Sequence, residues 1–289
     1  MQAKGISLHI GLNAVDPIHY QGWNGELYAC EADAEDMRKL ARSRGFTTQS
    51  LLTAQATRRN VIDSITDTAN KLSSGDIFIL SYSGHGGQLP NSKEIDGQDE
   101  TWCLYDAQLI DNELYRLLGL FKIGVRVLVF SDSCHSGTVT KPDAAIQRKF
   151  ETGTMSVNDD SILRSRNMPK GDANSVYFAN KSFYDAILND DSLADTRNQV
   201  HASVLLLSGC RDEQLSRENA FHGLFTGRLL RVWQDGLFSG DYKQFHDDIL
   251  KGMPKNQTPN YCPVGVVNSA FEGQVPFTID FPGSPVTRL

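Results

Sequence analysis

Two segments, IFILSYSGHGG at residues 77–87 and VRVLVFSDSCHSG at residues 125–137, indicate the architecture of this protein. Each begins with apolar residues that do not alternate cleanly with polar ones, a pattern that indicates a strand buried on both faces. Each then turns to small and polar residues, which include His85 in the first stretch and Cys134 in the second. Because ligands in open α/β sheets bind outside the carboxyl ends of the strands, we expect the imidazole and the thiol to face one crevice.

Glycines accompany both residues. Gly84 and Gly86 flank His85, and Gly137 follows Cys134. Glycine permits backbone conformations and close approaches that side chains prevent, so the N–H group of Gly86 is the best candidate to donate to a bound carbonyl oxygen. A single histidine or cysteine at a strand end is at least as often structural as functional. The two together favour a nucleophile and its proton-transfer partner.

Strands and helices alternate along most of the chain. Further strands are predicted at 5–12, 47–53, 203–208 and, at an edge, 264–267; helices are predicted at 27–45, 57–73, 220–234, 241–251 and from Asp111 onward. This alternation implies right-handed crossovers and a mostly parallel sheet with helices on both faces. We therefore expect one three-layer α/β domain over residues 1–289.

The stretch 138–200 interrupts this alternation. It is polar, with brief apolar periodicity only around 176–188, and we interpret it as a variable insertion between two strands. Long loops in compact domains are commonly functional. The insertion carries several basic residues, namely Arg148, Lys149, Arg164, Arg166 and Lys170.

Composition excludes several classes of protein. The formal net charge of −7 argues against a general nucleic-acid or anionic-membrane binder, which needs a concentrated basic face, and it suits a basic substrate. The start of the chain is too weakly apolar for a signal peptide, and no stretch is long enough to span a membrane, so a cytoplasmic location is expected. The five cysteines are scattered without CxxC spacing, which indicates reduced thiols.

Five motifs carry a family resemblance: YSGHGG at 82–87, DGQDE at 96–100, LIDNEL at 109–114, DSCHSG at 132–137 and SGCRDEQ at 208–214. With them the sequence resembles the caspase-like cysteine peptidases, and more closely their metacaspase and orthocaspase branch, over nearly the whole chain except 138–200. His85 precedes Cys134 by about 50 residues, the order and spacing of caspases, although the QAC-type signature is absent. The resemblance implies a caspase-like α/β fold, a Cys134/His85 dyad without an obligatory third member and hydrolysis of peptide bonds.

The implied chemistry gives each residue a role. The Cys134 thiolate attacks the scissile carbonyl, and His85 protonates the leaving amine and helps to activate water. The N–H groups of Gly86 and Cys134 hold the oxyanion. His135 is expected at most to line the rim of the pocket.

Charge predicts the specificity. Asp132 lies two residues before Cys134 on an extended segment, hence on the same side, and Ser83 has the same relation to His85. Cys30 and Asp33 are neighbours on one helix face. By similarity to metacaspases, Cys30, Asp33, Ser83 and Asp132 line the pocket for the residue before the cut. Two carboxylates there bind Arg or Lys and repel Asp, although Asp33 could instead be a solvated acid on the helix surface.

Calcium is the one cofactor that the resemblance suggests. Asp99, Asp111 and Asn112 match positions of carboxylate ligands in relatives, but Asn112 replaces an acid. Lys141 stands where a further acidic ligand is expected, seven residues after the cysteine. Calcium sites need several oxygen ligands with net negative charge, so we expect weak or absent calcium dependence.

Three readings remain open from the sequence. The first is an endopeptidase for protein or peptide substrates with Arg or Lys at the cut, which could process its own insertion. The second is a catalytically latent caspase-fold scaffold that binds partners. The third is a flavodoxin-like ligand-binding domain, which lacks support because no phosphate-binding glycine motif is present. By the resemblance we expect a monomer.

Overall fold

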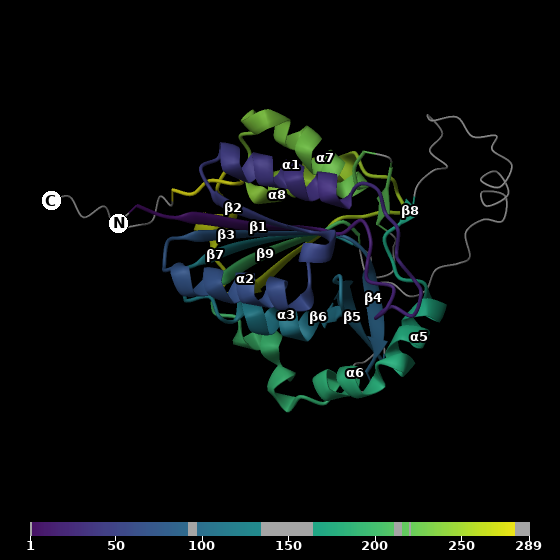
Figure 1. The fold of residues 1–289 in the computed structure, drawn as a ribbon. Helices are drawn as coiled ribbons and strands as arrows, with labels where there is room; N and C mark the ends of the chain where they lie inside the picture. The colour runs from purple at the N-terminus through teal and green to yellow at the C-terminus, as the bar shows by residue number, and fades with distance from the viewer. Residues whose placement is uncertain (1, 92–96, 134–163, 211–215, 220, 281–289) are drawn as a thin grey trace, which may run out of the picture.

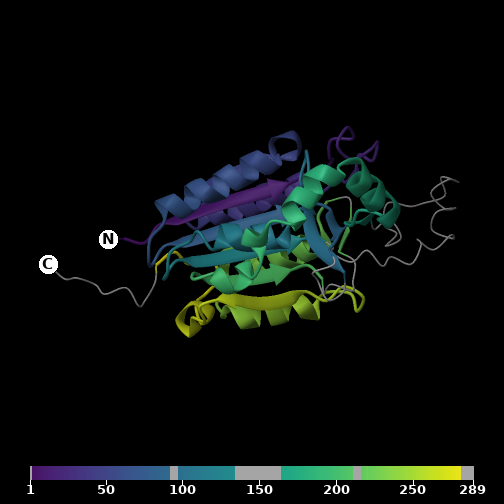
Figure 2. The ribbon, with the colours of Figure 1, turned by 90° about the horizontal axis from the view of Figure 1, so that it is seen from below.

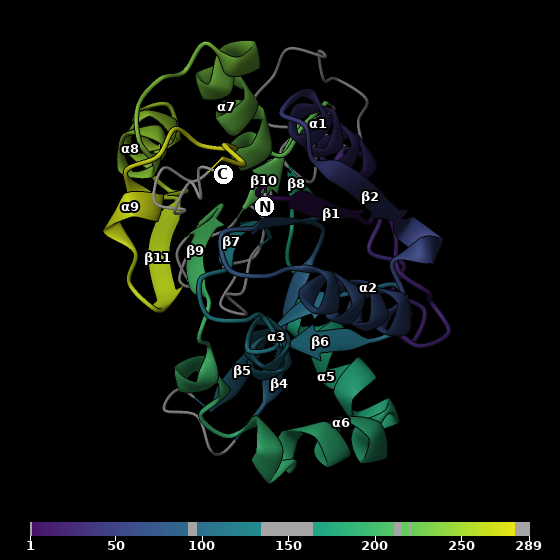
Figure 3. The ribbon, with the colours of Figure 1, turned by 90° about the vertical axis from the view of Figure 1, so that its left-hand side faces the viewer.

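The computed structural model describes residues 2–91, 97–133, 164–210, 216–219 and 221–280. Its centre is a six-stranded sheet with the order β11-β9-β7-β3-β1-β2 (Figure 3). Neighbouring strands in this sheet are parallel, except that β11 runs antiparallel to β9. The strands are β1 (Gly5–Gly11), β2 (Thr47–Leu52), β3 (Ile77–Ser83), β7 (Arg126–Asp132), β9 (Ser203–Ser208) and β11 (Asn260–Gly265).

Helices cover both faces of the sheet and complete the expected three layers (Figure 1). One face carries α1 (Cys30–Ser43), α7 (Leu224–Trp233) and α8 (Tyr242–Lys251), and the other carries α2 (Arg58–Lys71) and α3 (Asp111–Leu118). A short helix, α9 (Ser269–Glu272), follows β11. The predicted strands and helices are confirmed, with shifts of a few residues at their ends.

The central strands explain why the sheet has two apolar faces. Every residue of β3 and of β7 is buried. Phe78 and Leu80 pack into the cluster formed with α2 and α3, whereas Ile77 and Ile79 pack into the cluster formed with α1, α7 and α8. The prediction that both faces are buried is therefore confirmed. In the register of the two strands Ser83 lies beside Asp132, so both polar strand ends occupy the same edge.

A smaller antiparallel sheet lies toward the carboxyl ends of the main strands (Figures 1 and 2). It consists of β4 (Gly86–Pro90), β5 (Gln98–Cys103) and β6 (Gln108–Ile110), and the sequence did not predict it. Helices α5 (Lys170–Ala179) and α6 (Lys181–Leu188) share its apolar cluster.

The predicted insertion is therefore not a loop throughout. From Arg164 onward it folds: β8 (Arg164–Ser165) pairs with β10 (Arg217–Glu218), and α5 and α6 follow. The reason is tertiary, because Val176, Tyr184 and Leu188 are buried against residues such as Leu89. Residues 138–163 of the insertion lie outside the described residues.

Helices capable of crossing a membrane were sought in the described ranges, and none is both long and apolar enough.

One buried polar residue makes the central sheet sensitive to acid. His9 in β1 is fully buried, its Nδ1 lies 2.8 Å from the Ser81 hydroxyl and its Nε2 lies 2.9 Å from the Ser7 hydroxyl. Burial lowers the pKa of His9 from 6.5 to about 3, and the nearby Arg38 adds to this effect. The unfolded chain thus binds a proton at His9 below pH 6.5 that the folded chain does not.

We predict that the free energy of unfolding falls as the pH is lowered from 6.5 toward 3. Through His9 alone the loss should be on the order of 2 kcal/mol by pH 5, because each pH unit below the unfolded pKa costs about 1.4 kcal/mol. Urea denaturation at pH 7 and pH 5 measures it. His9→Gln should lose this part of the pH dependence, and His201→Gln, at an exposed position, should keep it. Equal pH dependence in the wild type and His9→Gln would contradict the prediction.

Candidate functional site

His85 lies buried between the end of β3 and the start of β4. Its Nε2 is 3.0 Å from the carbonyl oxygen of Gly25, and its ring packs on Trp23 with the ring centroids 4.8 Å apart. Gly25 has φ = 54°, and a Cβ there would approach the imidazole Cδ2 to 3.1 Å. Glycine at this position therefore relieves a strained backbone and leaves room for the ring.

The Gly25 contact determines which nitrogen can act as a base. A carbonyl oxygen only accepts, so Nε2 carries the proton and Nδ1 presents its lone pair. Within the described residues Nδ1 makes no hydrogen bond. Burial lowers the pKa of His85 to about 4, although the Gly25 carbonyl and the backbone of Asn167 oppose the shift. At neutral pH the imidazole is therefore an uncharged base.

Gly86, the predicted oxyanion donor, follows His85 directly. Its N–H group donates to the carbonyl oxygen of Arg166 at 3.0 Å, so it already points at a peptide carbonyl. The predicted nucleophile Cys134 lies outside the described residues, as do His135, Arg148 and Lys149. The described part of β7 ends at Asp132, two positions before Cys134 in the sequence.

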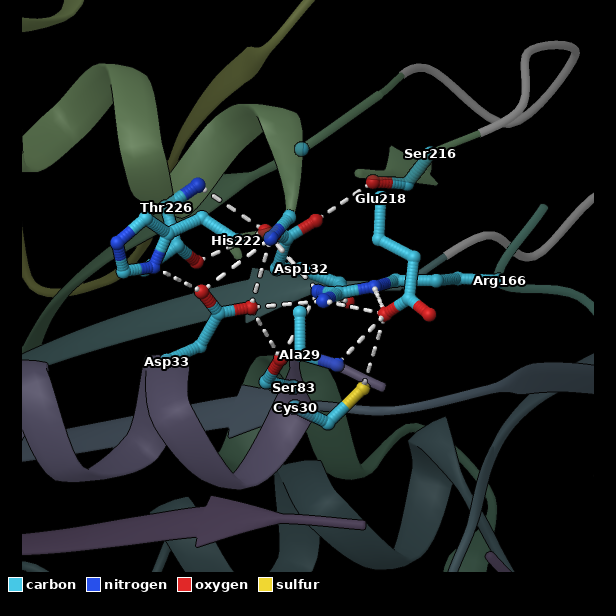
Figure 4. Close-up of polar contacts among 12 residues, drawn as sticks. Ala29, Cys30, Asp33, Ser83, Asp132, Arg166, Ser216, Glu218, His222 and Thr226 are labelled. Atoms are coloured by element: carbon cyan, nitrogen blue, oxygen red, sulfur yellow. Dashed lines mark hydrogen bonds and ion pairs between the residues drawn. The ribbon is translucent and has the colours of Figure 1, made fainter. Parts of the chain in front are cut away.

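The four residues expected in the specificity pocket lie together (Figure 4). The Ser83 hydroxyl donates to Asp33 at 2.9 Å, and one guanidinium contacts Asp33, Asp132 and Ser83. Each of the four is buried. The alternative reading of Asp33 as a solvated surface acid is wrong, because its side chain is only 1% exposed.

The guanidinium belongs to Arg166, which is itself completely buried. Its Nη2 lies 2.7 Å from Asp33, and its Nη1 lies 3.1 Å from Asp132 and donates to Ser83 at 2.8 Å. A cavity of about 10 Å³ remains beside these groups, too small for more than a single water. Arg166 therefore fills the space between the two aspartates.

Glu218 is a third carboxylate at the same guanidinium, and sequence reasoning missed it. Its Oε2 accepts from Nη2 of Arg166 at 3.0 Å and from Nε at 3.3 Å. It also accepts from the backbone N–H groups of Tyr28 and Ala29, just before α1. The Cys30 thiol lies 3.7 Å from Oε2, and burial raises the pKa of this thiol, which keeps it neutral.

Other residues missing from the sequence prediction hold the carboxylates in place. Ser216 donates to Asp132 at 2.6 Å, and Thr226 donates to it through its backbone N–H and its hydroxyl. The N–H of Gly223 donates to Asp33. A Cβ at Gly223 would lie 2.4 Å from Nη1 of Arg166, so this wall of the pocket must be glycine. The only sequence signal for these residues is their proximity to the SGCRDEQ motif.

Electrostatics favours a cation in this pocket. Burial by itself lowers the pKa of Arg166, but the charges of Asp132, Asp33 and Glu218 outweigh burial and raise it well above its usual value. At the rim, half-buried His222 places Nδ1 3.0 Å from Asp33, and this hydrogen bond raises its pKa. The carboxylates of the pocket thus favour positively charged side chains.

The candidate calcium ligands have different surroundings. Asp99 accepts from Asn91 at 2.9 Å, Asn112 accepts from Thr196 through its backbone carbonyl at 2.9 Å, and Asp111 borders a cavity together with Glu100. In the ranges that the structure describes, no group of three His, Cys, Asp or Glu side chains is placed to hold a metal ion. Asp99 and Asn112 thus each have a protein contact of their own.

Several curated proteins are similar to the chain. It is 27% identical to Metacaspase-1 of Mycosarcoma maydis over 78% of its length and 61% of that protein. It is 28% identical to Metacaspase-1 of Schizosaccharomyces pombe over 81% of its length and 60% of that protein. A shorter match, 33% identical over 42% of the chain and 32% of the relative, is to Metacaspase-4 of Arabidopsis thaliana. The chain thus spans about three fifths of the two metacaspases named first.

Solved structures share the fold. Protein GSU0716 from Geobacter sulfurreducens superposes with a TM-score of 0.84 at 52% identity, covering 96% of this chain and 99% of that one. Caspase-1 from Spodoptera frugiperda superposes with a TM-score of 0.54 at 13% identity, covering 91% and 87%. The second likeness shows the caspase fold alone.

A family model described as Caspase domain matches residues 13–270, which include His85, both aspartates of the pocket and Glu218. Together with the three-layer fold and the metacaspase relatives, this match shows that the chain belongs to the caspase-domain family.

Proposed function

We propose that this chain is a cysteine endopeptidase that hydrolyses peptide bonds after arginine and lysine, with Cys134 as nucleophile and His85 as its proton-transfer partner. One observation carries the proposal. Three buried carboxylates bind the guanidinium of Arg166, and the backbone carbonyl oxygen of Arg166 accepts a hydrogen bond from the N–H of Gly86, the residue after His85. Family membership and the metacaspase relatives support the peptidase class. The substrates would be proteins or peptides, and the monomeric state stays a prediction.

The reaction uses the unprotonated nitrogen of His85. Nδ1 takes the proton of the Cys134 thiol, and the thiolate adds to the carbonyl carbon before the scissile bond. The N–H groups of Gly86 and Cys134 donate to the oxyanion. The imidazolium then protonates the leaving amine and, neutral again, removes a proton from the water that hydrolyses the thioester.

The pocket distinguishes substrates by charge and by shape. An aspartate at the cut would face Asp33, Asp132 and Glu218 and be repelled. Arginine offers a planar set of N–H donors, and Arg166 uses its Nε and both terminal nitrogens in this pocket. Lysine presents a single ammonium and has no Nε–H for Glu218. We therefore propose that arginine is preferred over lysine.

A latent caspase-fold protein that acts by binding partners is the second candidate. Arg166 favours it, because this residue occupies the pocket that a substrate would need. Alkylation separates the two candidates: a thiol-reactive peptide with arginine at its reactive end should label Cys134 in a peptidase and leave it unlabelled in a latent scaffold.

We also propose that catalysis needs no calcium. The candidate ligands Asp99 and Asn112 already contact Asn91 and Thr196, respectively, and Asn112 and Lys141 stand where relatives carry acids.

The first prediction from the proposed function concerns the charge of the substrate residue before the cut. Fluorogenic peptides that end in arginine should be hydrolysed, matched peptides that end in aspartate should not, and Cys134→Ala should abolish the activity. Asp132→Asn keeps the size of the side chain and removes its charge, so it should lower kcat/KM for arginine peptides about 100-fold. Hydrolysis of the aspartate peptides at an equal rate would refute the proposed specificity.

The second prediction concerns Glu218. Glu218→Gln should lower kcat/KM for arginine peptides by roughly 10–100-fold, because one charge-assisted hydrogen bond is lost, and should lower it less for lysine peptides. The measured quantity is the ratio of the two kcat/KM values. Glu35→Gln removes the same charge from a residue of α1 that pairs with Arg38, and should leave the ratio unchanged. An unchanged ratio in Glu218→Gln would exclude Glu218 as a selectivity residue.

The third prediction concerns calcium. EDTA should leave hydrolysis of the arginine peptide within about two-fold of the untreated rate, because Asn112 and Lys141 supply no negative charge where a calcium site would need it. The assay is run with EDTA, with EDTA and excess calcium, and with EDTA and excess magnesium. Loss of activity that calcium alone restores would contradict the prediction.

A further inference from the structure

The residues just before Arg166 lie along β10 as an extended strand. In the antiparallel pairing of β8 with β10, Arg164 lies opposite Glu218. The N–H of Arg166 continues this pairing, because it donates to the carbonyl oxygen of Ser216 at 2.9 Å. Addition of an extended peptide to a strand edge is a common mode of peptide recognition. Residues 164–166 therefore trace a path by which a substrate strand can reach the specificity pocket.

Two arginines of this strand share one side of it. Side chains alternate along an extended strand, so residues two positions apart point to the same face. Arg166 enters the specificity pocket and contacts Asp33. Arg164 contacts Glu26 and Tyr28, which lie a few residues before Asp33. Both guanidinium groups thus meet the short stretch of chain that leads into α1.

The guanidinium of Arg164 has several contacts with this stretch. Its Nη1 donates to the backbone carbonyl oxygen of Glu26 at 2.9 Å and lies 3.4 Å from Oε2 of the same residue. Its Nη2 donates to the hydroxyl of Tyr28, and its central carbon lies 3.9 Å from the centroid of the Tyr28 ring. A cation over an aromatic face is attracted by the ring. Glu26 and Tyr28 therefore form a second binding place for a guanidinium, here named the upstream subsite.

The upstream subsite is connected to the specificity pocket through one carboxylate. The N–H of Tyr28 donates to Oε1 of Glu218 at 2.8 Å, and Oε2 of Glu218 accepts from Arg166 at 3.0 Å. The N–H of Leu27 donates to the carbonyl oxygen of Asn13 at 2.8 Å. The backbone that carries the Tyr28 ring is therefore held on two sides, and the two subsites keep a fixed separation.

The residue between the two arginines contributes through its backbone. Ser165 lies opposite Arg217 in β10, and its hydroxyl donates to the side-chain oxygen of Asn167 in the same segment. Its side chain thus contacts the segment itself rather than Glu26 or Tyr28. A residue of another type can therefore take this place with little cost.

The upstream subsite is more open than the specificity pocket. The side chains of Arg164 and Glu26 are 28% and 58% exposed, whereas Arg166 is completely buried. Ion pairs and cation–π contacts at exposed sites contribute less than buried ones. The upstream subsite should therefore adjust the rate for a substrate, and the specificity pocket should decide whether the substrate is accepted.

We propose that Glu26 and Tyr28 select a second basic residue in the substrate, two positions before the arginine at the cut. The inference rests on the proposed function and narrows its substrate class to peptides of the form Arg-x-Arg, with a tolerant middle position. The chain itself shows the complementary pair of contacts in Arg164 and Arg166.

The test compares three fluorogenic peptides, Arg-Ser-Arg, Ala-Ser-Arg and Glu-Ser-Arg, that share the final arginine. With the purified full chain, kcat/KM should be about 10-fold higher for Arg-Ser-Arg than for Ala-Ser-Arg, because a cation–π contact and an exposed ion pair each contribute a few-fold. Glu-Ser-Arg should be hydrolysed most slowly, since Glu26 repels it. Arg166 must leave the pocket for every peptide, so its displacement cancels in the ratios.

Two variants assign the preference to the upstream subsite. Tyr28→Leu removes the ring and Glu26→Gln removes the charge, and each should lower the ratio of kcat/KM for Arg-Ser-Arg over Ala-Ser-Arg to about three or less. Asp63→Asn removes a charge from an exposed carboxylate of α2 that pairs with Arg59, and should keep the wild-type ratio. Damage to the fold lowers both values together, so the ratio reports on the subsite.

Equal kcat/KM values of wild type for Arg-Ser-Arg and Ala-Ser-Arg overturn the inference and leave the proposed function standing. A wild-type ratio that persists in both Tyr28→Leu and Glu26→Gln also overturns it. Calorimetry adds a readout without hydrolysis: the full-length Cys134→Ala chain should bind Arg-Ser-Arg about 10-fold more tightly than Ala-Ser-Arg. Equal affinities, or binding of neither peptide, again overturn the inference. Failure of the proposed function alone is distinct, since it shows selective binding without hydrolysis by the wild type.

Discussion

One guanidinium forms ion pairs with carboxylates from three separate parts of the chain: helix α1, the end of β7 and the strand β10. Breaking a buried ion pair by removing one partner costs about 3–5 kcal/mol, so this end of the fold depends on having a cation in that place. The same ion pairs join the described part of the insertion to the carboxyl edge of the sheet. They also explain why Gly223 has no room for a side chain. Arg166 thus contributes to the stability of this end of the fold.

The sequence predicted the parts of this arrangement that follow from strong local patterns. The apolar runs of β3 and β7 have neighbours on both faces, and the register of the two strands brings Ser83 beside Asp132. Asp33 could be placed through the helical spacing that it shares with Cys30. These positions lie within or next to strongly patterned elements, and the resemblance to metacaspases assigned them to one pocket.

The remainder depends on contacts that no local pattern records. Glu218 belongs to a two-residue strand without periodicity, and its place is fixed by backbone donors that precede α1. The small sheet has short strands, of which β4 contains glycine and proline, and it packs with α5 and α6 in one apolar cluster. Arg166 was one of several basic residues in a polar stretch. Only the folded chain distinguishes it, because its burial depends on groups distant in sequence.

Each carboxylate of the pocket also has donors of its own. Thr226 and Ser216 donate to Asp132, Gly223 donates to Asp33, and the turn before α1 donates to Glu218. Each of the three anions therefore has a hydrogen bond from the protein in addition to its contact with Arg166, and these donors restrain the carboxylates around the cation.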